Sequence, residues 1–178
     1  MLGIGQRSAA ATSDAPSATR VQPPAEIAAA LPEARLRGQG TLRFLGFAVY
    51  EVRLWASPAF VPERYDAEAF ALEFLYARKL EGATISASSI DEMRRVDRFD
   101  EARVGGWQAA MARAFPDVAR GDRLSGVHLG QGTTHFFHNA KATASIADAE
   151  FGRLFFGIWL GATSSEPALR RQLIGEAR

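Results

Sequence analysis

The chain has 178 residues, 47% of them hydrophobic, which is the size and composition of one domain with a substantial core. Its net charge of +1 gives no electrostatic basis for nucleic-acid binding, and its lack of cysteine excludes disulfides, thiolate zinc ligands and a cysteine nucleophile. The longest apolar run, around residues 154–161, is too short for a transmembrane span.

Residues 1–25 are rich in Ala, Ser, Thr and Pro and contain almost no bulky apolar side chains. Such a segment cannot offset its own ordering entropy, so we predict a flexible tail followed by one domain over residues 26–178. The tail lacks the continuous apolar core of a secretory signal. A short polar tail fits an exported, periplasmic protein whose leader has been removed, and a cytoplasmic protein is the alternative.

Three strands are expected in the first half of the chain. After a short helical or irregular segment at 26–36, broken at Pro32, residues 38–56 are rich in aromatic and β-branched side chains and contain glycines suited to a tight bend. They predict two strands joined by a turn. Residues 70–79 place apolar side chains at alternate positions, which predicts a half-buried strand that ends at Gly82.

Helices and a further hairpin are expected next. The sequence Ser-Ile-Asp-Glu at 89–92 matches a capping box and predicts that a helix begins there. A second helix is predicted over 100–115, where Pro116 stops it. Residues 123–129 and 133–139 predict two strands connected across Gly130-Gln131-Gly132.

The C-terminal region predicts two helices. Ser145 to Asp148 can cap the first of them, and Pro167 suits the first turn of the second. The first carries a wide apolar stripe made of Phe151, Leu154, Phe155, Ile158 and Trp159. Adjacent strands without regular alternation with helices indicate an α+β fold, in which helices cover one face of a mainly antiparallel sheet.

Several kinds of active site lack support in the sequence. His135 and His138 lie three residues apart on a predicted strand and so point to opposite faces, which does not favour a metal site. The chain contains no G-x-S-x-G motif, no phosphate-binding loop and no dinucleotide fingerprint. We therefore predict no metal and no cofactor.

Two polar residues, Arg43 and Tyr50, interrupt the apolar run at 38–56. A guanidinium is rarely buried without a partner. The partner of Arg43 is either a carboxylate of the protein, such as Glu51 or Glu73, or an anionic or enolic group on a ligand. The first alternative makes Arg43 a structural residue, and the second makes it part of a binding site.

The sequence resembles the chalcone isomerase-like superfamily in its bacterial branch. The similarity covers residues 36–175, and the segments that carry it are GQGTLRFLGFAVYEVRLW, LEFLYARKLEG, SSIDEMRR, Trp107 with Met111, FPDVARGDRLSGV and EFGRLFFGIWLGATSSEPALRRQL. The resemblance implies an open-faced β-sandwich, with a large antiparallel sheet, a helical layer and a ligand cleft between them. Bacterial members are often exported, which agrees with the tail.

Two functions are known in that superfamily. Its plant enzymes close a chalcone into a flavanone without a cofactor, using an early-strand arginine to stabilise the developing enolate. Another branch binds fatty acids, with the same arginine and a tyrosine on the carboxylate. Arg43 falls where the family arginine is expected, Tyr50 lies near a strand threonine of the enzymes, and Lys141 or Thr143 falls near a late polar contact.

The resemblance implies that this protein binds a small amphipathic acid, with Arg43, Tyr50, Lys141 and Thr143 as ligand-binding residues. The alternative is a cofactor-free isomerase, an intramolecular lyase acting on an enone, with Arg43 and Tyr50 as catalytic residues. The plant enzymes also use a tyrosine and an asparagine in their helical middle. This chain has no tyrosine after Tyr76 and no asparagine before Asn139, which favours binding.

Overall fold

A six-stranded sheet forms the centre of the molecule. The computed structural model describes residues 21–176, so most of the predicted flexible tail lies outside the described residues. The strands pair in their chain order and every pair is antiparallel. They are β1 (Arg35–Phe44), β2 (Phe47–Ala56), β3 (Ala69–Tyr76), β4 (Arg123–Leu129), β5 (Thr133–His138) and β6 (Lys141–Ala147).

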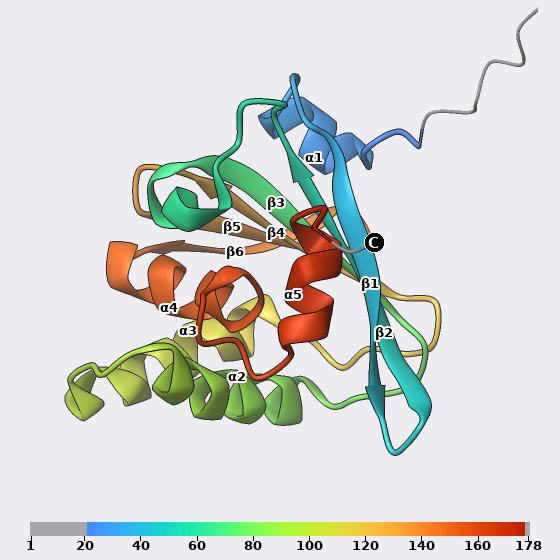
Figure 1. Cartoon of the computed structure of the whole chain (residues 1–178). Coiled ribbons are helices and arrows are strands. Elements are labelled where there is room, and N and C mark those ends of the chain that lie inside the picture. The colour runs from blue at the N-terminus through green and yellow to red at the C-terminus, as the bar shows by residue number, and fades with distance from the viewer. Residues whose placement is uncertain (1–20, 177–178) are drawn as a thin grey trace, which may run out of the picture.

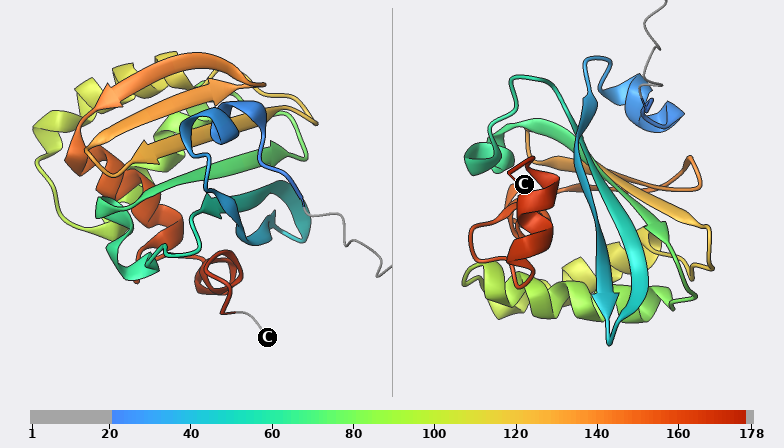
Figure 2. Two further views of the ribbon diagram at one scale, coloured as in Figure 1. Left: turned by 90° about the horizontal axis from the view of Figure 1, so that it is seen from above. Right: turned by 45° about the vertical axis from the view of Figure 1, so that its right-hand side comes forward.

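Helices cover one face of this sheet, and a single short helix lies on the other face (Figures 1 and 2). Helix α5 runs alongside β1. Helix α2 packs against α4 and α3, and α3 packs against β6. The α-helices are α1 (Ala25–Ala30), α2 (Gly82–Val96), α3 (Val104–Ala114), α4 (Ala149–Leu160) and α5 (Pro167–Leu173), and the 3-10 helices are η1 (Pro62–Ala67) and η2 (Glu101–Arg103). No helix within residues 21–176 is long and apolar enough to cross a membrane.

The main core lies between the sheet and α2, α3 and α4. Helix α4 contributes most to it, because its apolar stripe includes the fully buried Phe151, Leu154 and Phe156. The rings of Phe151 and Phe156 pack edge-on against aromatic residues of the sheet, such as Phe70, 4.8 Å from Phe156 between ring centroids. Burial of these aromatic side chains holds α4 in a fixed position against the sheet. The position of α4 in turn sets the shape of the space between this helix and the sheet.

A smaller cluster under α1 closes the opposite face of the sheet. Ile27 of α1 packs there with Trp55 and other apolar residues of the sheet. The Trp55 indole N–H donates to the buried Glu73 carboxylate at 2.8 Å, and Arg123 lies 3.7 Å from Glu73 and 3.0 Å from Glu26. Glu73 is thus engaged on the outer face of the sheet and is not a partner of Arg43.

A β-bulge divides the pairing of β1 with β2. Phe44 faces Phe47 and Arg43 faces Ala48, but the next pair is Leu42 with Tyr50. The extra residue in β2 shifts the register by one between Leu42 and Arg43. Since side chains alternate between the two faces of a strand, this shift changes which residues of β1 and β2 share a face.

The α+β class with an antiparallel sheet and a helical layer is confirmed, and so are the first hairpin, a strand at β3, the hairpin of β4 and β5, and α4. The prediction that β3 is half-buried is wrong, because the small cluster under α1 buries its second face. The predicted start of α2 at Ser89 is wrong, because the helix begins at Gly82. The amide of Gly82 donates to Asp117 Oδ1 at 2.9 Å. A contact between residues so distant in sequence leaves no local signal for the helix start.

Other boundaries also differ from the sequence predictions. Residues 35–36 belong to β1 instead of the helical segment expected over 26–36. Residues 101–103 form the 3-10 helix η2 before α3, which begins at Val104 and not at residue 100. Strand β6 was missed, since its small and polar residues show little apolar alternation. Ser145 lies within β6, and Asp148 caps α4 by accepting a hydrogen bond from the Phe151 amide at 3.0 Å.

Candidate functional site

A cleft of about 660 Å³ lies between the inner face of the sheet and helices α2 and α4. This volume falls within the range of small-molecule sites, about 300–1,000 Å³. Its wall is mainly apolar, and the aromatic and aliphatic side chains that form most of it are Leu42, Phe44, Val49, Tyr50, Phe74, Tyr76, Leu80, Ile85, Phe115, Leu124, Phe136, Phe155, Ile158 and Trp159. The cleft suits a ligand with a hydrophobic body.

Tyr50 projects from β2 into the cleft, and its hydroxyl oxygen accepts a hydrogen bond from the Trp159 indole N–H at 3.0 Å. Burial raises the pKa of Tyr50 well above its ordinary value, and the nearby carboxylates of Glu166 and Glu92 raise it further. The phenol is therefore neutral at physiological pH. Its oxygen is occupied as an acceptor, so its proton remains available for donation to an oxygen atom of a ligand.

The other tyrosine of the cleft wall, Tyr76, also remains neutral, because burial raises its pKa. The ring centroids of Tyr50 and Tyr76 lie 5.8 Å apart in an edge-on arrangement. Neither phenol is suited to act as a general base near neutral pH. The tyrosines therefore offer the cleft hydrogen-bond donors and apolar ring surface, but no anionic group.

Charge is distributed unequally along the cleft. Thr84, Ser88 and Glu92 line it from one face of α2 at intervals of four residues, so the first and last lie about 12 Å apart along the helix axis. Arg78 lines the cleft at the Thr84 end, and Glu166 joins Glu92 at the other end. Among residues 21–176, Arg78 is the one cationic side chain on the wall of the cleft, and no salt bridge to it is formed.

The acidic end of the cleft is partly neutralised by the protein itself. Glu92 accepts a hydrogen bond from the Ser165 hydroxyl at 2.6 Å and lies 3.5 Å from the Arg95 guanidinium. Ser165 and Glu166 lie between α4 and α5 and also line the cleft. A ligand carboxylate would be repelled from this end and attracted to the end that holds Arg78.

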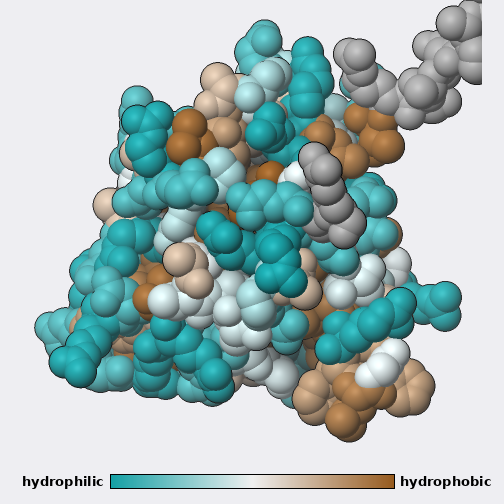
Figure 3. All heavy atoms as spheres, in the orientation of Figure 1, coloured by the Kyte–Doolittle hydropathy of each residue, from teal (hydrophilic) through white to brown (hydrophobic). Residues whose placement is uncertain are grey.

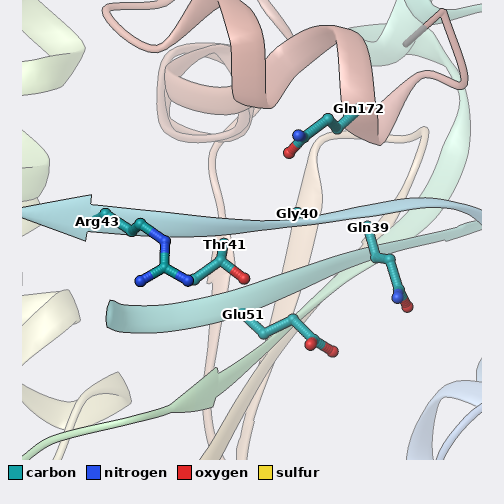
Figure 4. Close-up of a pocket in the computed structure, with 6 residues that line it drawn as sticks. All are labelled: Gln39, Gly40, Thr41, Arg43, Glu51 and Gln172. Carbon is teal, nitrogen blue, oxygen red and sulfur yellow. The ribbon is translucent and has the colours of Figure 1, made fainter. Parts of the chain in front are cut away.

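The structure separates Arg43 from Tyr50, although both belong to the first hairpin. Arg43 lies over a shallow polar depression of about 510 Å³ on the edge of the sheet, beside Gln39, Thr41, Glu51 and Gln172 (Figure 4). The Arg43 guanidinium donates to the Gly46 carbonyl at 3.3 Å. Glu51, suggested by the sequence as its partner, is instead 2.6 Å from Arg53.

The two remaining residues predicted to bind a ligand lie on β6, at the sheet edge opposite β1. Lys141 is exposed at the start of this strand. The Thr143 hydroxyl donates to the Ala114 carbonyl at 2.9 Å and so ties β6 to the end of α3. Neither residue lies on the cleft wall. Across residues 21–176, His, Asp and Glu side chains form no cluster of three or more that could hold a metal ion.

Sequence reasoning missed Arg78, Trp159 and the polar stripe on α2. Trp159 was assigned to an apolar stripe, and its indole N–H toward Tyr50 depends on a contact across 109 residues of chain. The spacing of Thr84, Ser88 and Glu92 is a signal that could have been found, because residues four apart share a helix face. It was obscured by placing the start of the helix at Ser89.

An antiparallel sheet with a helical layer and an internal cleft defines a class of open-faced sheet-and-helix proteins. Within this class, the chain belongs to the chalcone isomerase-like family, whose model matches residues 15–175. The resemblance to this family drawn from the sequence is therefore confirmed, and the bacterial branch stays a prediction. No curated protein is significantly similar in sequence.

A fatty-acid binding protein of Arabidopsis thaliana has a similar structure, with a TM-score of 0.61. The two share 11% sequence identity, and the similarity covers 80% of this chain and 87% of the other. Likeness at this identity establishes the common fold.

Proposed function

We propose that this protein binds a small amphipathic acid, of the fatty-acid type, in the cleft between the sheet and helices α2 and α4. The observation that carries the proposal is an apolar cleft of about 660 Å³ with a single cation, Arg78, at one end of its wall within the described residues. Apolar surface favours the body of such a ligand, and the cation favours its carboxylate. The similar Arabidopsis protein, named for fatty-acid binding, supports the same proposal.

The charges at the two ends of the cleft favour one orientation of the bound ligand. Its carboxylate would pair with the Arg78 guanidinium, which can form two parallel hydrogen bonds to the carboxylate oxygens. The acyl chain would lie along Phe74, Phe136 and Phe155. The opposite direction is disfavoured, because it would bring the carboxylate toward Glu92 and Glu166.

Tyr50 has a positioning role in this proposal. Its hydroxyl is held by the Trp159 indole and has a proton free to donate. It would donate this proton to a carboxylate oxygen of the ligand, and its ring would contact the acyl chain. Tyr50 is the one residue of the predicted site that lies on the cleft wall.

The assignment of the head group to Arg78 can be tested against the sequence-based prediction of Arg43. Palmitate binding to Arg78→Gln and to Arg43→Gln would be measured by isothermal titration calorimetry and compared with the unmodified protein. Loss of a hydrogen-bonded charge pair corresponds to a roughly 10- to 100-fold weaker affinity. We expect this loss in Arg78→Gln, and little change in Arg43→Gln because its side chain lies outside the cleft.

Weakening by Arg43→Gln alone would restore the sequence-based prediction and reject Arg78 as the partner of the carboxylate. If the unmodified protein does not bind palmitate, or other saturated fatty acids of different lengths, the proposed function itself is wrong. Both variants change exposed side chains, so their thermal stability should match that of the unmodified protein. This measurement separates lost binding from lost folding.

The alternative, a cofactor-free isomerase that acts on an enone, stays a prediction. Chalcone turnover above the background rate, lost in Tyr50→Phe, would support it. Export to the periplasm also stays a proposal, supported by the composition of residues 1–25. Fractionation of the cells that naturally produce the protein would test it, and recovery in the cytoplasmic fraction would count against export.

A further inference from the structure

The end of the β1–β2 hairpin carries an unusual concentration of exposed apolar side chains. Phe44 is 63% exposed, Leu45 is 81% exposed and Phe47 is 72% exposed. They fall within four consecutive residues, which we call the hairpin tip (residues 44–47). The tip extends beyond the helical layer (Figures 1 and 2), and apolar surface gathers on it in the space-filling view (Figure 3). Folding of the domain does not bury these side chains.

The backbone conformation of the turn indicates that Leu45 does not stabilise the fold. Leu45 and Gly46 form a two-residue turn in which both have positive φ, 50° and 82°. Such turns favour Asn, Asp or Gly, because a larger side chain is strained in the left-handed region. Leu45 breaks this preference at a position where its side chain is 81% exposed and adds little to the packing of the domain. A local rule broken without structural benefit points to function.

Basic residues flank the tip. Arg43 immediately precedes it, and Arg78 and Lys79 follow the end of β3, which lies beside it because the Ala77 amide donates to the Val49 carbonyl at 2.9 Å. All three are exposed, and none forms a salt bridge with another residue of 21–176. The two segments that meet here, residues 40–50 and 74–90, contain one acidic residue, Glu81. The tip is therefore apolar with a positively charged margin.

The tip also lies beside the part of the cleft wall that is formed by the hairpin, where we place the cleft opening. Phe44 and Val49 of the hairpin and Arg78 beside it all line the cleft wall. A surface that receives the tip would therefore lie next to the cleft opening and to the cation proposed for the head group. Because the tip and the cleft opening are adjacent, a surface that binds the tip could also supply the ligand to the cleft.

We propose that the hairpin tip docks on the surface of a lipid bilayer, with its apolar side chains inserted at the boundary of head groups and acyl chains. Aromatic and leucine side chains beside arginine and lysine are the composition that binds at this interface, and the basic margin favours anionic lipids. A protein partner is a poorer fit, because a tip of four residues is far smaller than the roughly 800 Å² that each partner buries in a stable interface.

The test is co-sedimentation of the whole protein with sucrose-loaded vesicles, made either of phosphatidylcholine alone or of an equal mixture with phosphatidylglycerol. We expect binding to the mixed vesicles, and a loss of at least about tenfold in the double variant Leu45→Asn/Phe47→Ser, because each side chain contributes its apolar burial. Leu45→Asn also suits the left-handed turn, so it should preserve or raise the melting temperature. Arg43→Gln should weaken binding to mixed vesicles about fivefold.

A matched control is Leu129→Asn, which changes a leucine that is 36% exposed at the end of β4, away from the hairpin tip. It should bind vesicles like the unmodified protein. Equal vesicle binding by the double variant, or failure of the unmodified protein to bind either vesicle, would overturn the proposal. So would a concentration-dependent dimer in light scattering that Leu45→Asn abolishes, because the tip would then be a protein interface.

This inference stands apart from the proposed function, and the experiments distinguish their failures. The double variant leaves the cleft wall intact, since neither Leu45 nor Phe47 lines it, so its palmitate affinity in vesicle-free solution should be unchanged. Vesicle binding without palmitate binding would reject the proposed function alone. Palmitate binding without vesicle binding would reject the docking surface alone.

Discussion

The Trp159 indole N–H donates to the Tyr50 hydroxyl at 3.0 Å and so connects helix α4 to strand β2 across the cleft. The Trp159 ring also packs against Phe74, with 4.8 Å between ring centroids, and Phe74 packs edge-on against Tyr50. One hydrogen bond and two aromatic contacts thus fix the width of the cleft at this point. They hold the Tyr50 hydroxyl in the cleft before any ligand arrives, which reduces the entropy cost of binding.

Replacing Tyr50 by Phe should lower the free energy of unfolding by about 1 kcal/mol, because the Trp159 N–H loses its acceptor in a partly buried site. Urea denaturation would measure this change. Trp159→Phe is the partner variant, and the double variant should cost less than the two single losses added together. Strict additivity would mean that the hydrogen bond contributes nothing to stability.

A tryptophan at Ser88 should block the cleft. Ser88 lies on the exposed side of α2 and lines the cleft, so a large ring there would occupy the space proposed for the acyl chain. We expect palmitate affinity to fall at least about tenfold, a loss of about 1.4 kcal/mol, in isothermal titration calorimetry. The control is Ala87→Trp, one residue earlier on the same helix, exposed and outside the cleft wall. Similar affinities for the two variants would place the ligand elsewhere.

Stability in acid should depend on Asp148. Burial alone would raise the pKa of Asp148, but hydrogen bonds from the Trp107 indole and the Phe151 amide, together with the charge of Arg103, hold its pKa below the ordinary value. A carboxyl whose pKa is lowered by folding contributes stability that is complete above its unfolded pKa of about 3.9. That contribution is lost as the pH falls through the lower pKa of the folded state.

Asp148→Asn keeps an acceptor for capping α4 but removes the charge. It should therefore be less stable than the unmodified protein at pH 7, and the difference should shrink as the pH falls below about 4. Urea denaturation at a series of pH values would measure it. A stability difference that stays constant from neutral to acidic pH would show that the carboxylate charge is not the cause.

Two glycines should respond in opposite ways to replacement by alanine. A methyl group on Gly157 of α4 would lie 2.6 Å from Val96 Cγ1 and 2.7 Å from Tyr65 Oη, so Gly157→Ala should destabilise the fold by about 1–3 kcal/mol. At Gly105 of α3, no described atom beyond its chain neighbours and the nearby backbone of its own helix lies within 4 Å of the added methyl group. Gly105→Ala should stabilise the protein by about 0.5–1 kcal/mol through its helix propensity. Thermal unfolding of both variants would check the signs.

Much of the fold could be predicted because its signals are local. The aromatic and β-branched run at 38–56, the alternation from Phe70 and the apolar stripe from Phe151 to Trp159 each identified an element. The start of α2 could not be predicted, because it depends on Asp117, which is 35 residues away in the sequence. Strand β6 was not predicted, because its own composition does not favour a strand. It is a strand because it pairs with β5.

The residues of the candidate site could be predicted from the sequence less well than the fold. Arg43 and Tyr50 were identified together because both interrupt one apolar run, and the structure brings only Tyr50 to the cleft. Arg78 follows the end of β3 and carries no local sign of a role. Its proposed role rests on the folded sheet and α2, which place it beside the hairpin and on the wall of an apolar cleft.

The amino-acid sequence was enough to establish the family, the α+β class, the first hairpin and the absence of cysteine chemistry. Which residues of that hairpin face the cleft became clear only from the folded chain. With an unbroken register from the two-residue turn, Tyr50 would oppose Thr41 and share a face with Arg43. The bulge pairs Tyr50 with Leu42 instead. Because side chains alternate along a strand, that one extra residue turns Tyr50 into the cleft while Arg43 points away from it.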